Sequence, residues 1–220
     1  MKLFGIDLST LERQRRIKAI ASQLEQDRFE RAKKEQASSV YQATFRMRQG
    51  DLKGAVDILP HGPLAATTFA EWRAAGLIDD EQLRSVLLRI FCLAGYPCRA
   101  LPRATWLEWF AIAGFVSDNG NLPPKEPLQV WRVEYGRELG LSWTRNPQVI
   151  ERAITTGTLL GLAGRVLRTH VPPSQVLGLI ETRNFLGVVE SRNEQEVIVH
   201  PSVRIEAVER VVGVPPWFDR

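Results

Sequence analysis

The sequence predicts an α+β protein in which an N-terminal all-helical region precedes a small, mainly antiparallel β domain. Apolar residues recur at helical spacing up to about residue 116, and a turn-rich segment follows at 117–127. Short runs rich in valine and isoleucine, typical of strands, come after it. Of the 220 residues, 44% are hydrophobic and 25% charged, which is ordinary for a globular protein with a buried core.

One long helix, or two in series, is expected over residues 9–48. No glycine or proline interrupts residues 6–49, and Ile17, Ile20 and Leu24 share one helical face. Residues 1–50 contain 11 of the 29 Lys and Arg residues but only 6 of the 25 Asp and Glu residues, which concentrates the net charge of +4 here. A basic helix is compatible with an acidic partner such as nucleic acid, although a solvated helix of mixed charge is the commoner case.

Shorter helices are expected next, each followed by a glycine or a proline: residues 52–59, 68–75, 80–93 and 103–113. Their large aromatic residues are expected to form a core rather than a stacking platform for nucleic-acid bases. These residues are Trp72, Trp106, Trp109, Phe110 and Phe115.

The three prolines and the polar turn residues of 117–127 indicate a linker. We therefore predict a helical domain at 1–116, for target recognition or regulation, and a β domain at 128–220. The strands are expected at residues 128–133, 165–171, 176–180, 185–190, 195–199 and 204–212. One helix should interrupt them, with Asn146 as its cap and Pro147 in its first turn.

A cytoplasmic location is expected, because the sequence has no signal-peptide core and no apolar run of membrane-spanning length. The two cysteines, Cys92 and Cys98, are too few for a disulfide framework or a zinc site, and we expect reduced, buried thiols. No metal and no membrane partner is expected.

Three elements of the β domain could carry chemistry. Arg132 lies in mid-strand beside apolar residues, where it needs a carboxylate or an anionic ligand. Ser142 and Thr144 precede the helix at 147, and Glu194 and Glu196 lead into a strand, two residues apart. Each element alone is more often structural than catalytic.

Their order and context resemble the ADP-ribosyltransferase fold of the arginine–serine–glutamate class, over residues 128–212. The segment Ser142-Trp143-Thr144 is similar to the serine motif that precedes a helix in that family. The segment from Glu194 to Val208 is similar to the family's E-x-E motif with its two following strands. The resemblance implies NAD as substrate and makes the C-terminal domain ADP-ribosyltransferase-like.

By this resemblance, Glu196 would be the main catalytic residue, stabilising the positive ribosyl species, and Ser142 would orient it. Glu194 would act on the incoming nucleophile. Arg132, Ser142, Trp143 and Thr144 would contact NAD, with Arg132 at the pyrophosphate and Trp143 as a guess for the nicotinamide stacking partner, because the following helix lacks the usual aromatic residue.

The expected function is mono-ADP-ribosyl transfer to a macromolecule, with protein arginine as the first acceptor to consider and nucleic acid as the second. A catalytically inactive module of the same fold and an NAD glycohydrolase remain alternatives. The small size fits an intracellular effector of a phage or toxin system. His170 and His200 are more consistent with surface or packing roles than with catalysis.

Overall fold

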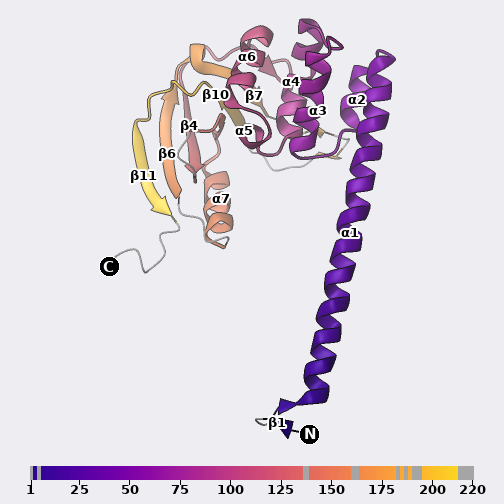
Figure 1. Ribbon diagram of the computed structural model, residues 1–220. Helices are drawn as coiled ribbons and strands as arrows, with labels where there is room; N and C mark the ends of the chain where they lie inside the picture. Colours follow the sequence, from indigo (N-terminus) through magenta and orange to yellow (C-terminus); the bar gives the residue numbers. More distant parts are fainter. Residues whose placement is uncertain are drawn as a thin grey trace. The chain divides into compact units, whose positions relative to one another are not determined.

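The computed structural model describes residues 2–3, 6–135, 139–159, 164–181, 184–185, 188–189 and 195–212. These residues form helices and a mixed β-sheet, with the helices concentrated towards the N-terminus, so the predicted α+β class is confirmed (Figure 1). The chain separates into two compact units, Met1–Pro60 and His61–Arg220.

The first unit is dominated by one long helix, as predicted. A short antiparallel pair, β1 (Lys2–Leu3) and β2 (Ile6–Asp7), precedes α1 (Leu8–Arg48) and the short α2 (Leu52–Asp57). The side chain of Asp51 caps α2 by accepting a hydrogen bond from the Gly54 amide at 2.9 Å. No helix in the described part of the chain is both long enough and apolar enough to cross a membrane.

The second unit begins with four helices. They are α3 (Pro63–Ala74), α4 (Asp80–Leu93), α5 (Pro97–Ala100) and α6 (Arg103–Ala113). Two of them, α4 and α6, have the predicted bounds, while α3 begins five residues before the predicted start at residue 68. The start of α4 is set by a capping box, in which Asp79 and Gln82 each bind the other's backbone amide. The one-turn helix α5 was not predicted, because four residues carry no periodic signal.

The core of these helices is aromatic, as the sequence predicted. Trp106 is fully buried and packs edge-on against Phe91 and Trp109, and Phe69 in turn packs edge-on against Trp109. Trp72 and Phe110 are also buried, so these rings have no exposed face for a nucleic-acid base. Phe115 packs instead against the core of the sheet.

A seven-stranded sheet forms the rest of the unit, in the order β11-β6-β4-β5-β10-β7-β3. Its strands are β3 (Val116–Ser117), β4 (Leu128–Glu134), β5 (Ser142–Thr144), β6 (Gly164–Val171), β7 (Val176–Ile180), β10 (Glu196–Val199) and β11 (Ala207–Val212). The helix α7 (Pro147–Leu159) connects β5 to β6, a 3-10 turn (Pro173–Gln175) precedes β7, and a separate pair joins β8 (Asn184–Phe185) to β9 (Val188–Val189). All pairings in the main sheet are antiparallel except the parallel β3–β7 pair.

The segment 117–127, predicted as an interdomain linker, lies inside the second unit, and the division between compact units falls at Pro60. The preceding strand β3 joins the sheet beside β7. Glu181, at the end of β7, accepts hydrogen bonds from Asn119 at 2.7 Å and Asn121 at 3.0 Å, and its backbone amide donates to the Asp118 carboxylate at 3.0 Å. These contacts fix the turn residues to the sheet.

Candidate functional site

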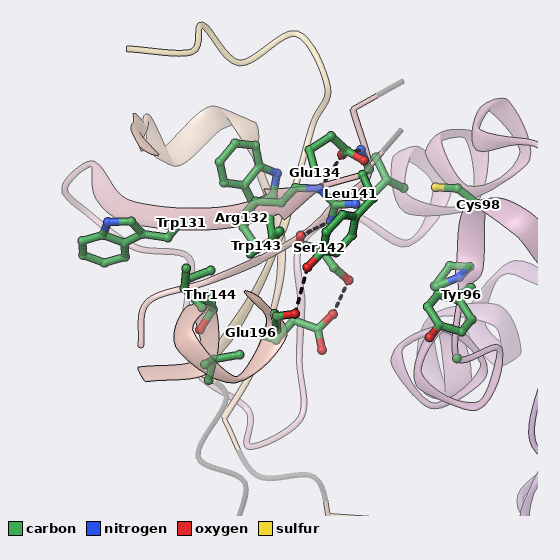
Figure 2. Close-up of a pocket in the computed structure, with 18 of the residues that line it drawn as sticks. Tyr96, Cys98, Trp131, Arg132, Glu134, Leu141, Ser142, Trp143, Thr144 and Glu196 are labelled. Atoms are coloured by element: carbon green, nitrogen blue, oxygen red, sulfur yellow. Dashed lines mark hydrogen bonds and ion pairs between the residues drawn. The ribbon is translucent and has the colours of Figure 1, made fainter. Parts of the chain in front are cut away.

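A pocket of about 710 Å³ opens in the second unit between the strands and the segment Gly95–Arg99, which runs from the end of α4 into α5. Figure 2 shows Arg132, Ser142 and Glu196 on the strand side, with Tyr96 and Cys98 on the helical side. Cavities of this size hold ligands as large as a dinucleotide. The pocket therefore brings together Arg132, Ser142 and Glu196, as the sequence predicted.

Ser142 and Glu196 are joined directly. Their strands pair antiparallel, with Ile198 opposite Ser142 and Glu196 opposite Thr144, so the serine and the glutamate point from the same face. The Ser142 hydroxyl donates a hydrogen bond to the Glu196 carboxylate (Figure 2). Only 7% of Glu196 is exposed, so this bond holds a buried carboxylate in one orientation at the pocket.

Thr144 has a different task from Ser142, although both hydroxyls belong to the predicted motif. Its hydroxyl accepts a hydrogen bond from the Asn146 amide at 2.9 Å, and the Asn146 side chain accepts from the Gln148 amide at 3.0 Å. Together they set the start of α7, with Asn146 in the predicted cap position. Thr144 lines the pocket but is nine-tenths buried, so it mainly orders the turn behind Ser142.

Trp143 lies in the hydrophobic core of the sheet. Only 2% of it is exposed, and it clusters with Val130, Val197 and Val199. Side chains alternate along a strand, so Trp143 points away from the face that carries Ser142. This burial argues against the suggested stacking role for its ring.

Arg132 forms an ion pair with Glu134, two residues further along β4. Its Nε lies 2.7 Å from a Glu134 carboxylate oxygen, and its Nη1 donates to the backbone carbonyl of Ser142. The arginine that the sequence suggested for the pyrophosphate therefore neutralises a buried carboxylate and supports the backbone of Ser142. Its position indicates a positioning residue for Ser142.

Gly140 is required where the chain passes over this pair. A methyl group at Gly140 would lie 2.1 Å from Nη2 of Arg132, much too close for two unbonded atoms. The Gly140 amide also donates to the Glu134 carboxylate at 3.0 Å. Glu134 and Gly140 thus hold the guanidinium from two sides.

Glu194 lies outside the described residues. The strand β10 begins at Glu196, and Gln195 before it has a φ of 44°, in the left-handed region that non-glycine residues seldom adopt. The Gln195 carbonyl accepts a hydrogen bond from the Arg145 amide at 3.1 Å, which anchors this turn. The role suggested for Glu194 therefore stays a prediction.

The helical wall of the pocket was not predicted from the sequence. It contains Tyr96, which is 70% exposed, and Arg99, whose guanidinium lies 5.1 Å from the centre of the Tyr96 ring. Burial of the Cys98 thiol raises its pKa, opposed by its hydrogen bond to the Leu141 backbone and by Arg132 and Arg103 nearby. The thiol is thus protonated at neutral pH. Cys98 was expected to be buried, but the residue is exposed.

Among the pocket features that were not predicted, the ion pair of Arg132 with Glu134 could have been found from the sequence, because residues two apart on a strand share a face. Tyr96 and Arg99 had none, since they reach the pocket through the packing of α4 and α5. His170 pairs with Glu206 at 2.7 Å and His200 with Ser202 at 2.7 Å, and neither histidine lines the pocket. Within the described ranges, no cluster of potential ligands is arranged to hold a metal ion.

Comparisons with protein-family models, with curated proteins and with solved structures find no match to this chain. What the pocket does is therefore inferred from its geometry and its chemistry.

Proposed function

We propose that this protein is an NAD-dependent mono-ADP-ribosyltransferase acting on a macromolecule. The observation that carries the proposal is the hydrogen bond from Ser142 to the buried carboxylate of Glu196, at a pocket of about 710 Å³. A buried carboxylate held in one orientation at a pocket is suited to stabilising a developing positive charge. The pocket volume is compatible with a dinucleotide.

In the proposed reaction, the bond between the ribose carbon and the nicotinamide nitrogen breaks, and nicotinamide leaves with the electron pair. The ribosyl group passes through an oxocarbenium-like species, as in other glycosyl transfers. Glu196 accepts a hydrogen bond from a ribose hydroxyl and stabilises the positive charge, and Ser142 keeps its carboxylate in place. A nucleophile of the acceptor then bonds to the ribose carbon and loses its proton.

The acceptor follows from the resemblance alone. The E-x-E motif makes a protein arginine the first acceptor to test, with Glu194 taking the proton of the incoming nitrogen. Nucleic acid is the second, because the first 50 residues hold 11 basic and 6 acidic side chains. A cytoplasmic setting, as for a phage or toxin effector, belongs to the same proposal.

The test is NAD binding and nicotinamide release by the purified protein, beside Glu196→Gln. The substitution is nearly isosteric, so we expect an intact fold and loss of nicotinamide release by a factor of at least about 100. Equal turnover in both proteins would show that Glu196 is not the catalytic carboxylate. No binding of NAD at millimolar concentration would favour a non-catalytic module of the same fold.

Transfer is distinguished from hydrolysis by adding candidate acceptors and following labelled ADP-ribose. Incorporation into a protein or nucleic acid supports the transferase, whereas release of free ADP-ribose alone identifies an NAD glycohydrolase. We expect Glu194→Ala to reduce transfer more than hydrolysis. Equal loss of both activities would remove the separate role of Glu194.

A further inference from the structure

The charges that line the pocket leave one cation for a ligand. Two arginines and two glutamates contribute to the lining: Arg99, Arg132, Glu134 and Glu196. Arg132 is already paired with Glu134. Within the part of the chain that the structure describes, Arg99 has no carboxylate partner, so it is the lining cation that remains for an anionic ligand.

The aromatic residues of the lining lead to the same wall. Phe91 and Trp143 are almost completely buried, and Tyr135 donates its hydroxyl to the Ala153 carbonyl at 2.8 Å. Trp131 packs against the cluster of Ile150 and Val166. Trp131 and Tyr135 are partly buried, whereas Tyr96, with 70% of its surface exposed, has the most exposed aromatic ring of the lining.

Tyr96 and Arg99 form one unit. The Arg99 guanidinium lies over the Tyr96 ring, 5.1 Å from its centre; Tyr96 immediately precedes α5, and Arg99 lies within it. A guanidinium held in this way remains charged and can give two hydrogen bonds to a phosphate. Because Arg99 lies over one face of the phenol ring, the opposite electron-rich face is the one left for a planar cation.

This wall is fastened on both sides. The Trp106 indole donates to the Pro97 carbonyl at 2.9 Å, which holds α5 against the aromatic core. The Arg103 guanidinium donates to the Leu139 carbonyl at 3.0 Å, in the chain that leads into β5. The position of Tyr96 and Arg99 relative to Ser142 is therefore set by the fold.

We infer that the segment Gly95–Arg99 forms half of the substrate site, with Arg99 binding the pyrophosphate of NAD and Tyr96 stacking on its nicotinamide ring. This inference rests on the proposed function. Neither residue belongs to residues 128–212, which carry the family resemblance. The helices at 61–116 are thus part of the active site rather than a separate recognition domain.

The experiment is calorimetric titration of the full chain with NAD and with ADP-ribose, which has the pyrophosphate but lacks nicotinamide. Tyr96→Ala should weaken NAD binding about tenfold and leave ADP-ribose binding unchanged, and Tyr96→Phe should bind NAD like the wild type because the ring remains. Arg99→Gln should weaken the binding of both ligands about tenfold. Tyr41→Ala and Arg28→Gln, at exposed positions of α1, are the matched controls.

An unchanged NAD affinity in Tyr96→Ala and Arg99→Gln would overturn the inference. The proposed function would survive that result as long as nicotinamide release still depended on Glu196. Equal weakening of NAD and ADP-ribose by Tyr96→Ala would overturn the assignment of the ring to nicotinamide. If the wild-type protein bound neither ligand, the proposed function itself would fail, and the inference with it.

Discussion

Arg132 and Glu134 form a partly buried ion pair on one face of β4, with 2.7 Å between Nε and the carboxylate oxygen. The same guanidinium donates to the carbonyl of Ser142, on the neighbouring strand β5. The pair therefore links a charge balance inside the sheet to the position of the serine that holds Glu196. Removing either partner leaves an uncompensated charge, whereas removing both does not.

We predict that Arg132→Gln and Glu134→Gln each lower the free energy of unfolding by about 2–3 kcal/mol, and that the double variant loses less than the sum. Urea unfolding of the four proteins gives this coupling energy. Both Arg132 variants should also release nicotinamide more slowly, because the carbonyl of Ser142 loses its donor. Strictly additive losses of stability would show that the pair contributes nothing as a pair.

Gly140→Ala should disturb the same guanidinium from the other side. The new methyl group would lie 2.1 Å from Nη2 of Arg132, which cannot retreat without breaking its bonds to Glu134 and Ser142. We expect a loss of about 1–3 kcal/mol in unfolding free energy and a lower kcat for nicotinamide release. In an Arg132→Gln background the same substitution should cost clearly less. An equal cost in both backgrounds would mean that the clash is elsewhere.

The ends of several helices were predictable because residues close to them in the sequence set them. The bounds of α4 and α6 match the predicted ranges, since capping residues and glycines mark them. The sheet order was not predictable, because strands that are distant in the sequence, such as β4 and β6, become neighbours through shared burial. The contacts of the segment 117–127 with Glu181 were not predictable for the same reason, since they cross more than 50 residues.

The candidate site was also predictable only in part. Ser142 and Glu196 were predicted from a motif, and their hydrogen bond brings them together as expected. The orientation of Trp143 needed the register of β5, which turns its ring into the core. The contribution of Tyr96 required the packing of α5 on the aromatic core, which no short motif encodes.

Glu181 should make the stability of the fold depend on pH in the acid range. Hydrogen bonds from Asn119, from Arg145 and from Asn121 lower its pKa below the ordinary value of 4.5, against a smaller opposing effect of burial. A carboxylate with a lowered pKa in the folded state stabilises the fold above its ordinary value, and this contribution disappears as the pH falls through the folded pKa. Glu181→Gln should thus be less stable than the wild type at pH 7.

The stability difference between wild type and Glu181→Gln should be constant from pH 7 to about pH 5 and shrink below about pH 4.5. Thermal unfolding at a series of pH values measures it. Glu71→Gln, on an exposed part of α3, is the control. A difference that stays the same down to pH 3 would show that the amide cluster does not depend on the charge of Glu181.

Tyr135 connects β4 to α7 through space left by two glycines. Its hydroxyl donates to the Ala153 carbonyl at 2.8 Å, and burial raises its pKa, which keeps the proton on the oxygen. A methyl group at Gly157 would lie 2.0 Å from this hydroxyl oxygen, and one at Gly164 would lie 2.5 Å from the ring. The ring therefore holds α7, which follows the Ser142 motif, in its place on the sheet.

The effect of Gly157→Ala on the free energy of unfolding is accordingly predicted to change sign when the Tyr135 ring is removed. In the wild type it should lower the free energy of unfolding by about 1–3 kcal/mol, because the methyl group displaces the Tyr135 ring. In a Tyr135→Leu background, where the ring is absent, it should stabilise the protein by up to about 1 kcal/mol, since alanine favours a helix over glycine. Urea unfolding of the two single variants and the double variant tests this. Destabilisation of equal size in both backgrounds would show that the tyrosine ring does not occupy the space beside Gly157.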